Sequence, residues 1–309
     1  MNFQQLRSVR ETVRQSFSLT EVANVLFTSQ PGVSRQIREL EEELGIDIFE
    51  RNGKRLTGLT EPGKEVLHII ERLLLEAENL QRAGETYAGK DSGTLSVAAT
   101  HTQTRYVLPR AVQHFRTTYP HVRIALQQSA PEHIAEWVLS GKADIGIATE
   151  GLSRFDELVS FPCYQWHHVI VVPEAHPLLK IKQVTLDHLA TYPLITYDKG
   201  FTGRSHIDEA FRDKGIEPDI VLTAMDSDVI QQYVSLGLGV GIVASMAAEY
   251  LPTGLKSIPA SHLFATNITR IAVRRGAFLR EYAVDFIRQL APKVSLKELA
   301  EVVSWRKQS

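Results

Sequence analysis

The stretch Ser18–Arg38, SLTEVANVLFTSQPGVSRQIR, decides the fold of the N-terminal part of the chain. Its apolar residues recur at helical spacing in two short runs separated by a tight turn. Ser18 is followed three residues later by Glu21, a spacing typical of the reciprocal cap that begins a helix. Pro31 falls in the first turn of the second run, where its missing N–H costs nothing. The stretch therefore predicts a helix-turn-helix, with Gln30–Glu43 as the recognition helix.

The recognition helix is predicted to have two different faces. Val33, Ile37 and Leu40 follow one another at four- and three-residue steps and form the apolar face. The opposite face carries amide, hydroxyl and guanidinium groups, which match the base edges and phosphates that border a major groove. From this face we expect contacts to DNA by Gln30, Pro31, Ser34, Arg35 and Arg38.

Helix pairs with this pattern also arise by chance, so the flanking sequence decides the interpretation. Asn2–Gln15 predicts a third amphipathic helix before the motif. After it, a short apolar run leads into a basic hairpin tip at Glu50–Arg55. Three helices and a basic hairpin make a winged helix, so residues 1–60 are predicted to be a DNA-binding domain. Arg51 and Arg55 would then touch the DNA backbone from the wing.

A long helix is predicted to follow the winged domain. Thr60 can cap it, and apolar residues recur from Val66 to Leu80 at three- and four-residue steps, close to a heptad pattern. A helix between two domains has little partner surface in its own chain, so the apolar stripe predicts self-association. The alternative is packing on its own C-terminal domain. Residues 61–92 are therefore assigned to a linker and dimerisation helix with a hinge.

Composition limits the classes of function. The 309 residues contain 34 Lys and Arg against 36 Asp and Glu, a net charge of −2, so DNA binding must come from local placement and dimer avidity. A single cysteine excludes an intrachain disulfide framework and fits a reducing compartment. The N-terminus does not read as a signal peptide, and apolar runs are shorter than a membrane span. We expect a soluble cytoplasmic protein that does not contact membranes.

The remaining chain alternates strands and helices. The order strand, helix, strand, helix, strand over residues 95–148 predicts a parallel sheet with helices on both faces. A second module follows, and a strand near 268–273 returns to the first, so the fold is predicted to be α+β multidomain with a two-lobed α/β effector domain similar to periplasmic binding proteins. The effector domain is predicted to span residues 93–309. Within it, lobe I covers about 93–162 and 266–292, lobe II about 163–265, and a C-terminal helix 293–309.

Three places after predicted strands carry threonine hydroxyls at the start of a helix or loop. They are the Thr100–Gln103 stretch, Thr149, and Thr202 within Gly200–Gly203. Ligands bind at such strand ends in doubly wound sheets. Hydroxyls and backbone amides without a carboxylate suit a fully ionised anion, such as sulfate or a sulfonate, better than a protonated phosphate. Helix capping alone explains any single threonine, and Trp166 fits either a residue that closes over the site or a core tryptophan.

Several motifs carry a family resemblance over the full length of the chain. They are the helix-turn-helix stretch, the wing IFERNGKRL (48–56), THTQTRY (100–106), GIATE (146–150) and GFTGR (200–204). The sequence resembles the LysR-type transcriptional regulators, and within them the branch that regulates sulfur assimilation and cysteine biosynthesis. A related branch, which serves sulfonate and other alternative sulfur sources, stays open.

The resemblance implies a homotetrameric activator, a dimer of dimers, that binds promoter DNA and contacts RNA polymerase. It also implies a small-molecule effector: N-acetylserine or O-acetylserine as inducer, with sulfate or thiosulfate as opposing signals. The positions that match the family's anion site are Thr100, Thr102, Gln103, Thr149 and Thr202, with Trp166 nearby.

Other readings of the sequence are weaker. The glycines of LGLGVG (236–241) follow a predicted helix and precede a strand, the reverse of a dinucleotide fingerprint. Cys163 has no second cysteine to pair with and fits a buried structural thiol better than a redox sensor. Because no nucleophile elbow, P-loop or zinc-ligand spacing is found, we expect no enzyme, no metal and no cofactor. The second class of function left open is an anion-binding protein without specific DNA recognition.

Overall fold

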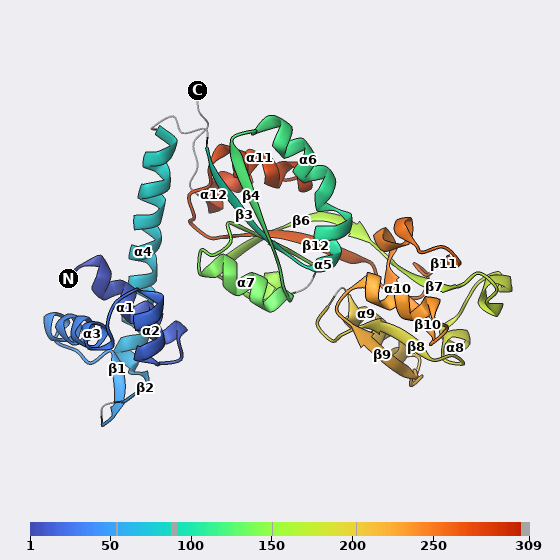
Figure 1. The fold of residues 1–309 in the computed structure, drawn as a ribbon, viewed down its shortest axis with the longest axis horizontal. Coiled ribbons are helices and arrows are strands. Elements are labelled where there is room, and N and C mark those ends of the chain that lie inside the picture. The colour runs from blue at the N-terminus through green and yellow to red at the C-terminus, as the bar shows by residue number, and fades with distance from the viewer. Residues whose placement is uncertain (54, 88–91, 150, 202, 304–309) are drawn as a thin grey trace. The chain divides into compact units, whose positions relative to one another are not determined.

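The computed structural model describes residues 1–53, 55–87, 92–149, 151–201 and 203–303. The chain forms two compact units, Met1–Ala88 and Gly89–Ser309, both drawn in Figure 1. Within these described ranges, no helix combines the length and the apolar character needed to span a membrane.

The first unit is a winged helix-turn-helix. The core side chains of the recognition helix, Val33, Ile37 and Leu40, are at most 1% exposed and pack with apolar residues from the neighbouring helices and the wing. Ser29 caps that helix by accepting the Gly32 N–H at 3.2 Å. The elements are α1 Phe3–Arg14, α2 Leu19–Val25, α3 Gln30–Leu44, the antiparallel pair β1 Phe49–Asn52 and β2 Arg55–Leu59, and α4 Glu61–Tyr87.

The sequence-based expectation of a capping box at Ser18 is wrong. Ser18 does occupy the position before α2, but within the described chain its side chain makes no capping hydrogen bond. The preceding Ser16 and Phe17 have positive φ angles of 49° and 65°. This bend and the backbone hydrogen bond from Phe17 N to Thr12 O, 2.8 Å long, shape the start of α2.

Helix α4 belongs to the first unit, which corrects the predicted domain end at residue 60. Ile70 and Leu74 are 2% exposed and complete the core of the winged domain. The expectation that this helix lacks a partner in its own chain therefore fails for Ile70 and Leu74. Three other apolar residues stay at the surface: Ile69, Leu73 and Leu80 are 47%, 41% and 76% exposed. These three positions keep the predicted self-association face.

The second unit contains two lobes, each built on a five-stranded sheet. In lobe I the strand order is β4-β3-β5-β12-β6, with β3 parallel to β4 and β5, and β12 antiparallel. Helices α6 and α11 cover one face and α7 the other (Figure 1). The elements are β3 Gly93–Ala99, α5 His101–Tyr106, α6 Leu108–Thr118, β4 Val122–Gln128, α7 Pro131–Leu139, β5 Ile145–Ala148, β6 Leu158–Trp166, β12 Asn267–Arg274, α11 Glu281–Leu290 and α12 Leu296–Val302.

Lobe II has the strand order β11-β7-β10-β8-β9. Helices α8 and α9 pack on one face and α10 on the other, because buried residues alternate between the two faces along β7, β8 and β10. The elements are β7 His168–Pro173, α8 Leu186–Leu189, β8 Leu194–Tyr197, α9 Arg204–Asp213, β9 Ile220–Ala224, α10 Ser227–Ser235, β10 Val240–Ala244 and β11 Leu255–Pro259, with 3-10 turns at Leu152–Arg154, Pro177–Lys180 and Ser245–Tyr250.

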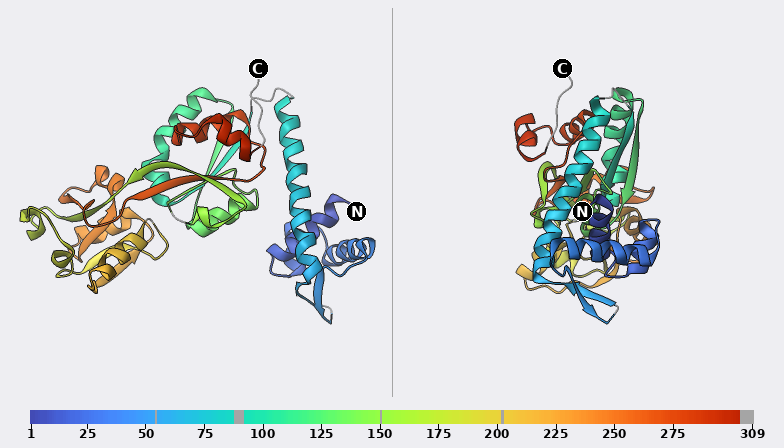
Figure 2. Two further views of the ribbon diagram at one scale, coloured as in Figure 1. Left: turned by 180° about the vertical axis from the view of Figure 1, so that it is seen from behind. Right: turned by 90° about the vertical axis from the view of Figure 1, so that its left-hand side faces the viewer.

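Two strands, β6 and β12, run from one lobe towards the other side by side (Figure 2). Residues 163–166 pair with β12 in the sheet of lobe I, so the predicted start of lobe II at residue 163 is too early. The helix predicted from Gly276 begins at Glu281, because Gly276 has a φ of +74° in a turn. Strands β6 and β11 were not predicted, and the tail helix α12 ends before the undescribed residues 304–309.

Candidate DNA interface and effector site

The outward face of α3 carries the predicted polar residues. Gln30, Pro31, Arg35 and Arg38 are exposed, and Ser34 is half-buried. The exposure follows from the helical period, which turns these positions away from Val33 and Ile37 in the core. The face therefore offers amide, hydroxyl and guanidinium donors on a rigid helix, which is what reading a major groove requires.

Arg35 is a strongly exposed charged donor of this face, with its side chain 80% exposed. Its Nε lies 2.7 Å from Glu39 Oε1, one helical turn away. The hydrogen bond from Arg35 lowers the pKa of the Glu39 carboxyl, and Gln5 of α1 donates to the other carboxyl oxygen at 3.2 Å. Glu39 thus orients Arg35 while leaving its terminal nitrogens open to solvent.

Arg51 of the wing has a different environment from the one expected. Its NH2 lies 2.5 Å from Glu41 Oε2, and the Glu41 side chain is only 7% exposed. The other Glu41 oxygen accepts the backbone N–H groups of Ile48 and Phe49 at 2.9 and 3.2 Å. This ion pair fixes the base of the wing to the recognition helix, and it engages one terminal nitrogen of Arg51 while the residue stays exposed. Arg55, on β2, is exposed.

The turn before α3 presents a residue that the sequence reasoning missed. Phe27 is 98% exposed and has a φ of +50°, a backbone conformation that bulky residues rarely adopt. It lies three residues before Gln30, at the end of the helix that faces DNA in this motif. The available sequence signal is an aromatic residue directly before the polar Thr28-Ser29 pair of the turn.

In the second unit, α5 brings three of the predicted effector residues together directly after β3. Thr100, Thr102 and Gln103 are 4%, 1% and 0% exposed. Thr100 precedes the helix as its cap residue, yet within the described chain its side chain makes no capping hydrogen bond. Capping therefore does not account for this threonine.

The hydroxyl of Thr102 is buried and has no hydrogen-bond partner among the described residues. Leaving such a group unsatisfied is unfavourable by about 1–3 kcal/mol. Buried polar groups are otherwise almost always paired, so the Thr102 hydroxyl is a group whose hydrogen bond the described chain does not supply.

Thr269 on β12, which the sequence reasoning missed, orients the neighbouring side chains. Its Oγ1 accepts from Trp166 Nε1 at 3.1 Å and from Gln103 Nε2 at 3.3 Å. Thr149 Oγ1 lies 3.4 Å away. Either of these two hydroxyls can be the donor in this contact. The sequence carries no distinct signal for this role, because β12 also contains Asn267, Arg270 and Arg274.

Tyr164 and Trp166 support the site from β6. Burial raises the pKa of the Tyr164 hydroxyl, which stays protonated and donates to Gln103 Oε1. Trp166 is 4% exposed, and its N–H is already taken by Thr269. Of the two interpretations of Trp166, the structure therefore favours the core tryptophan over a residue that closes on the ligand.

Lobe II meets these residues at the start of α9. A Cβ placed on Gly203 would lie 2.1 Å from Asn267 Oδ1 and 2.9 Å from His168 Cε1, so the backbone approaches both side chains closely. Asn267 Oδ1 is buried and has no hydrogen-bond partner among the described residues. Thr202, the predicted contact from this loop, lies outside the described residues.

Comparison with known proteins gives two matching family models. Residues 3–64 match the bacterial regulatory helix-turn-helix protein model of the lysR family, and residues 88–295 match the LysR substrate binding domain. The protein belongs to the LysR family of transcriptional regulators. The winged helix-turn-helix and the two-lobed domain predicted from the sequence are those of this family.

Two LysR-type relatives from Burkholderia cenocepacia cover nearly the whole chain. The HTH-type transcriptional regulator SsuR is 56% identical over 97% of this chain and 98% of the relative. The HTH-type transcriptional regulator CysB is 52% identical over 100% of this chain and 99% of the relative. The crystal structure of the cofactor-binding domain of the Cbl transcriptional regulator has a TM-score of 0.67 and 45% identity, covering 69% of this chain and 93% of that domain.

Cys163 of this LysR-type chain has the character of a structural thiol. Burial raises its pKa to about 12, so the thiol stays protonated at neutral pH. Its Sγ faces the backbone oxygen of Phe161 at 4.0 Å, within the sheet of lobe I. Because the thiolate is the reactive form, this environment fits the predicted structural role.

Proposed function

We propose that this LysR-type protein regulates genes of sulfur assimilation and cysteine biosynthesis in the cytoplasm. It binds promoter DNA through the winged helix-turn-helix and senses a small anion between its two lobes. The observation that carries the sensing part is the buried Thr102 hydroxyl, which has no hydrogen-bond partner among the described residues and is followed in α5 by the buried Gln103. The sulfur-related role rests on the relatives named SsuR and CysB.

The chemistry of the described site supports a fully ionised anion. Thr102 and Thr149 offer hydroxyl protons, and the Gln103 amide has a second N–H beyond the one given to Thr269. None of these three side chains is a carboxylate that would accept the proton of a protonated phosphate, which favours sulfate or thiosulfate. N-acetylserine and O-acetylserine, whose carboxylate is also ionised, are the inducers in this proposal, and Thr100 and Thr202 complete the proposed contacts.

Thr102→Val tests the site. Valine has the shape of threonine without the hydroxyl, so the variant should bind sulfate or thiosulfate about 10- to 100-fold more weakly, the loss of one hydrogen bond to a charged group. The unliganded variant should melt at the same temperature as the wild type or higher, because an unpaired buried hydroxyl is removed. Calorimetry of the full-length protein against sulfate, thiosulfate and the two acetylserines measures the first effect, and thermal unfolding the second.

The matched control is Thr104→Val on the same helix, whose hydroxyl donates to the Thr100 backbone oxygen at 3.1 Å. It should leave anion affinity within about twofold, since Thr104 belongs to the helix backbone network. Equal anion affinity of Thr102→Val and the wild type would contradict the proposed site.

Arg35→Ala tests the DNA interface. If Arg35 reads a guanine, the variant should lose about 1–3 kcal/mol of binding to its own promoter and discriminate less against a mutated base. Gel-shift titrations on the matched and mutated promoters at two salt concentrations measure this. Arg72→Ala, an exposed arginine of α4, serves as the control. A uniform loss on every sequence, with a shallower salt dependence, would instead assign Arg35 to a phosphate.

The proposed role as a transcriptional regulator also implies protein partners. The exposed Ile69, Leu73 and Leu80 of α4 support pairing of two subunits, and a dimer of dimers would bring four DNA-binding domains to one promoter. RNA polymerase is the proposed protein partner. An anion-binding protein without sequence-specific DNA recognition would retain all duplexes equally in the gel-shift experiment above.

The alternative regulatory role is the use of sulfonates and other alternative sulfur sources. The relatives named SsuR and CysB are 56% and 52% identical to this chain, so similarity favours neither role strongly. Promoter fragments from cysteine-biosynthesis genes and from sulfonate-utilisation genes, compared in the same gel-shift experiment, separate the two.

A further inference from the structure

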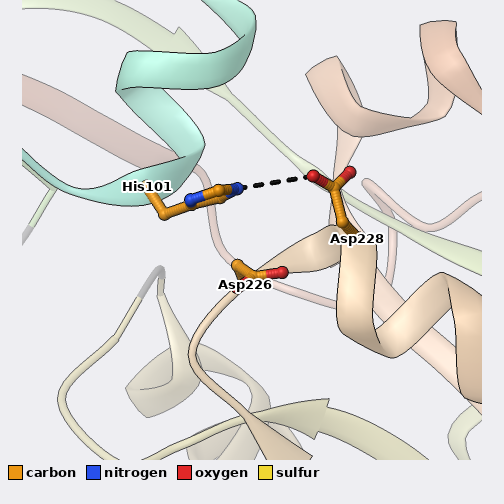
Figure 3. A group of neighbouring side chains, drawn as sticks. All are labelled: His101, Asp226 and Asp228. Carbon is orange, nitrogen blue, oxygen red and sulfur yellow. Dashed lines mark hydrogen bonds and ion pairs between the residues drawn. The ribbon is translucent and has the colours of Figure 1, made fainter. Parts of the chain in front are cut away.

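A carboxylate of lobe II receives three side chains from α5 of lobe I. Asp228 lies in the first turn of α10. His101 Nε2 is 3.4 Å from Asp228 Oδ2, and Arg105 Nε is 2.6 Å from the same oxygen. The Tyr106 hydroxyl donates to the other oxygen, Oδ1. Figure 3 shows the His101 ring pointing across to Asp228 at the start of the α10 helix.

Packing around Tyr106 strengthens this contact between the lobes. The Tyr106 ring stacks on Tyr250 with the centroids 5.6 Å apart and lies against the apolar core of lobe II. Burial and the neighbouring Asp228 raise the pKa of the Tyr106 hydroxyl, so it stays a donor. His101 is fixed from behind, since its Nδ1 lies 3.2 Å from Gln128 Oε1 at the end of β4.

The same short helix carries residues of the candidate effector site. Thr102 and Gln103 lie between His101 and Arg105 in the sequence and both are buried, and Gln103 donates to Thr269 of β12. A shift of lobe II that pulls on Asp228 must therefore move or release the helix on which these two residues lie.

We propose that Asp228 is a positioning residue for effector sensing, because it holds lobe II to the helix that presents Thr102 and Gln103. This inference rests on the proposed effector site. Effector occupancy and the arrangement of the lobes are then coupled through α5, so a change at Asp228 alters anion affinity although Asp228 does not touch the anion.

A metal ion is the competing interpretation of this cluster. His101, Asp226 and Asp228 place one ligand atom each within 4.8 Å of one another. Both oxygens of Asp228 already have donors, however, and Asp226 Oδ1 caps α10 by accepting the Val229 N–H at 3.0 Å. The Arg105 guanidinium at 2.6 Å would also repel a cation. The geometry therefore favours a contact between lobes.

The test compares Asp228→Ala with Asp226→Asn in the full-length protein. Asp226→Asn removes one negative charge from the residue that caps the same helix and keeps a good helix cap. We expect Asp228→Ala to bind sulfate or thiosulfate at least fivefold more weakly, while Asp226→Asn stays within about twofold of the wild type. Promoter binding without anion should be the same for all three proteins. Calorimetry and gel shift provide the two readouts.

A charge exchange distinguishes a direct contact from a general structural role. Arg105→Asp combined with Asp228→Arg should recover anion affinity that each single variant loses. Tyr106→Phe removes one hydrogen-bond donor to Asp228 and keeps the ring, so it should lose less anion affinity than Asp228→Ala. It replaces Asp228→Ala in the test if that variant does not fold.

Three results would overturn the inference. One is wild-type anion affinity in both Asp228→Ala and Tyr106→Phe, and another is failure of the charge exchange to recover affinity. The third is stabilisation of the wild type by Zn²⁺ or Mn²⁺ that His101→Ala abolishes, which would assign the cluster to a cation. Failure of the effector site itself is distinguishable, since the wild type would then bind none of the tested anions.

Discussion

Gly203→Ala is expected to abolish anion binding and to lower the melting temperature of the effector domain. Gly203 precedes α9 with a φ of +71°, where an L-residue is disfavoured by about 1–2 kcal/mol. The new methyl would lie 2.1 Å from Asn267 Oδ1 and 2.9 Å from His168 Cε1. Both of those side chains are fully buried, so they cannot swing into solvent. Either α9 or β12 must move, at the point where the lobes meet.

Gly215→Ala is the matched control for this experiment. Gly215 follows the other end of α9 with a φ of +68°, and a Cβ there would have no atom within 4 Å. Both variants share the backbone strain, so the difference between them isolates the close approach at Asn267. We expect anion affinity to fall more than tenfold only in Gly203→Ala, measured by calorimetry, with thermal unfolding beside it. Similar behaviour of the two variants would show that the close approach has no role.

Gly63→Ala is expected to destabilise the DNA-binding unit by about 3 kcal/mol, the upper end for overpacking. A Cβ on Gly63 would lie 2.0 Å from the backbone oxygen of Ile48, and backbone cannot rotate away as a side chain can. The same Ile48 oxygen accepts the Thr60 N–H at 3.1 Å, and Ile48 N donates to Glu41. Moving α4 therefore disturbs the base of the wing and its connection to the recognition helix.

Promoter affinity of the Gly63→Ala protein should fall together with its unfolding midpoint in denaturant. Gly84→Ala tests the same substitution in the same helix, at a position where a Cβ meets nothing within 4 Å. That control should be more stable than the wild type by about 0.5–1 kcal/mol, because alanine favours a helix interior. Full promoter binding by Gly63→Ala would refute the close contact.

The order of the elements was predictable because it depends on local patterns. Helical spacing of Val33, Ile37 and Leu40 identified the buried face of the recognition helix, and Pro31 marked its first turn. The alternation of strands and helices likewise predicted two α/β lobes. Such periods depend on which face of an element is buried, so the sequence reports them directly.

Two of the predicted site residues have partners in the structure that the sequence did not reveal. Arg51 was predicted to contact the DNA backbone from the wing, but it forms an ion pair with the buried Glu41 carboxylate, ten residues away. Trp166 reads as a possible cover for the ligand, but its N–H belongs to Thr269, far along the chain. Neither partner can be found from local spacing.

The periodic placement of apolar and turn-forming residues was thus enough to establish a winged helix-turn-helix followed by a two-lobed α/β domain. Only the tertiary structure decided which polar groups meet: Thr269 with Gln103 and Trp166, Asp228 with α5, and Thr102 with no partner in the described chain. The reason is physical. Burial of one face is a property of each segment, whereas a hydrogen bond between distant segments depends on the register and packing that they reach together.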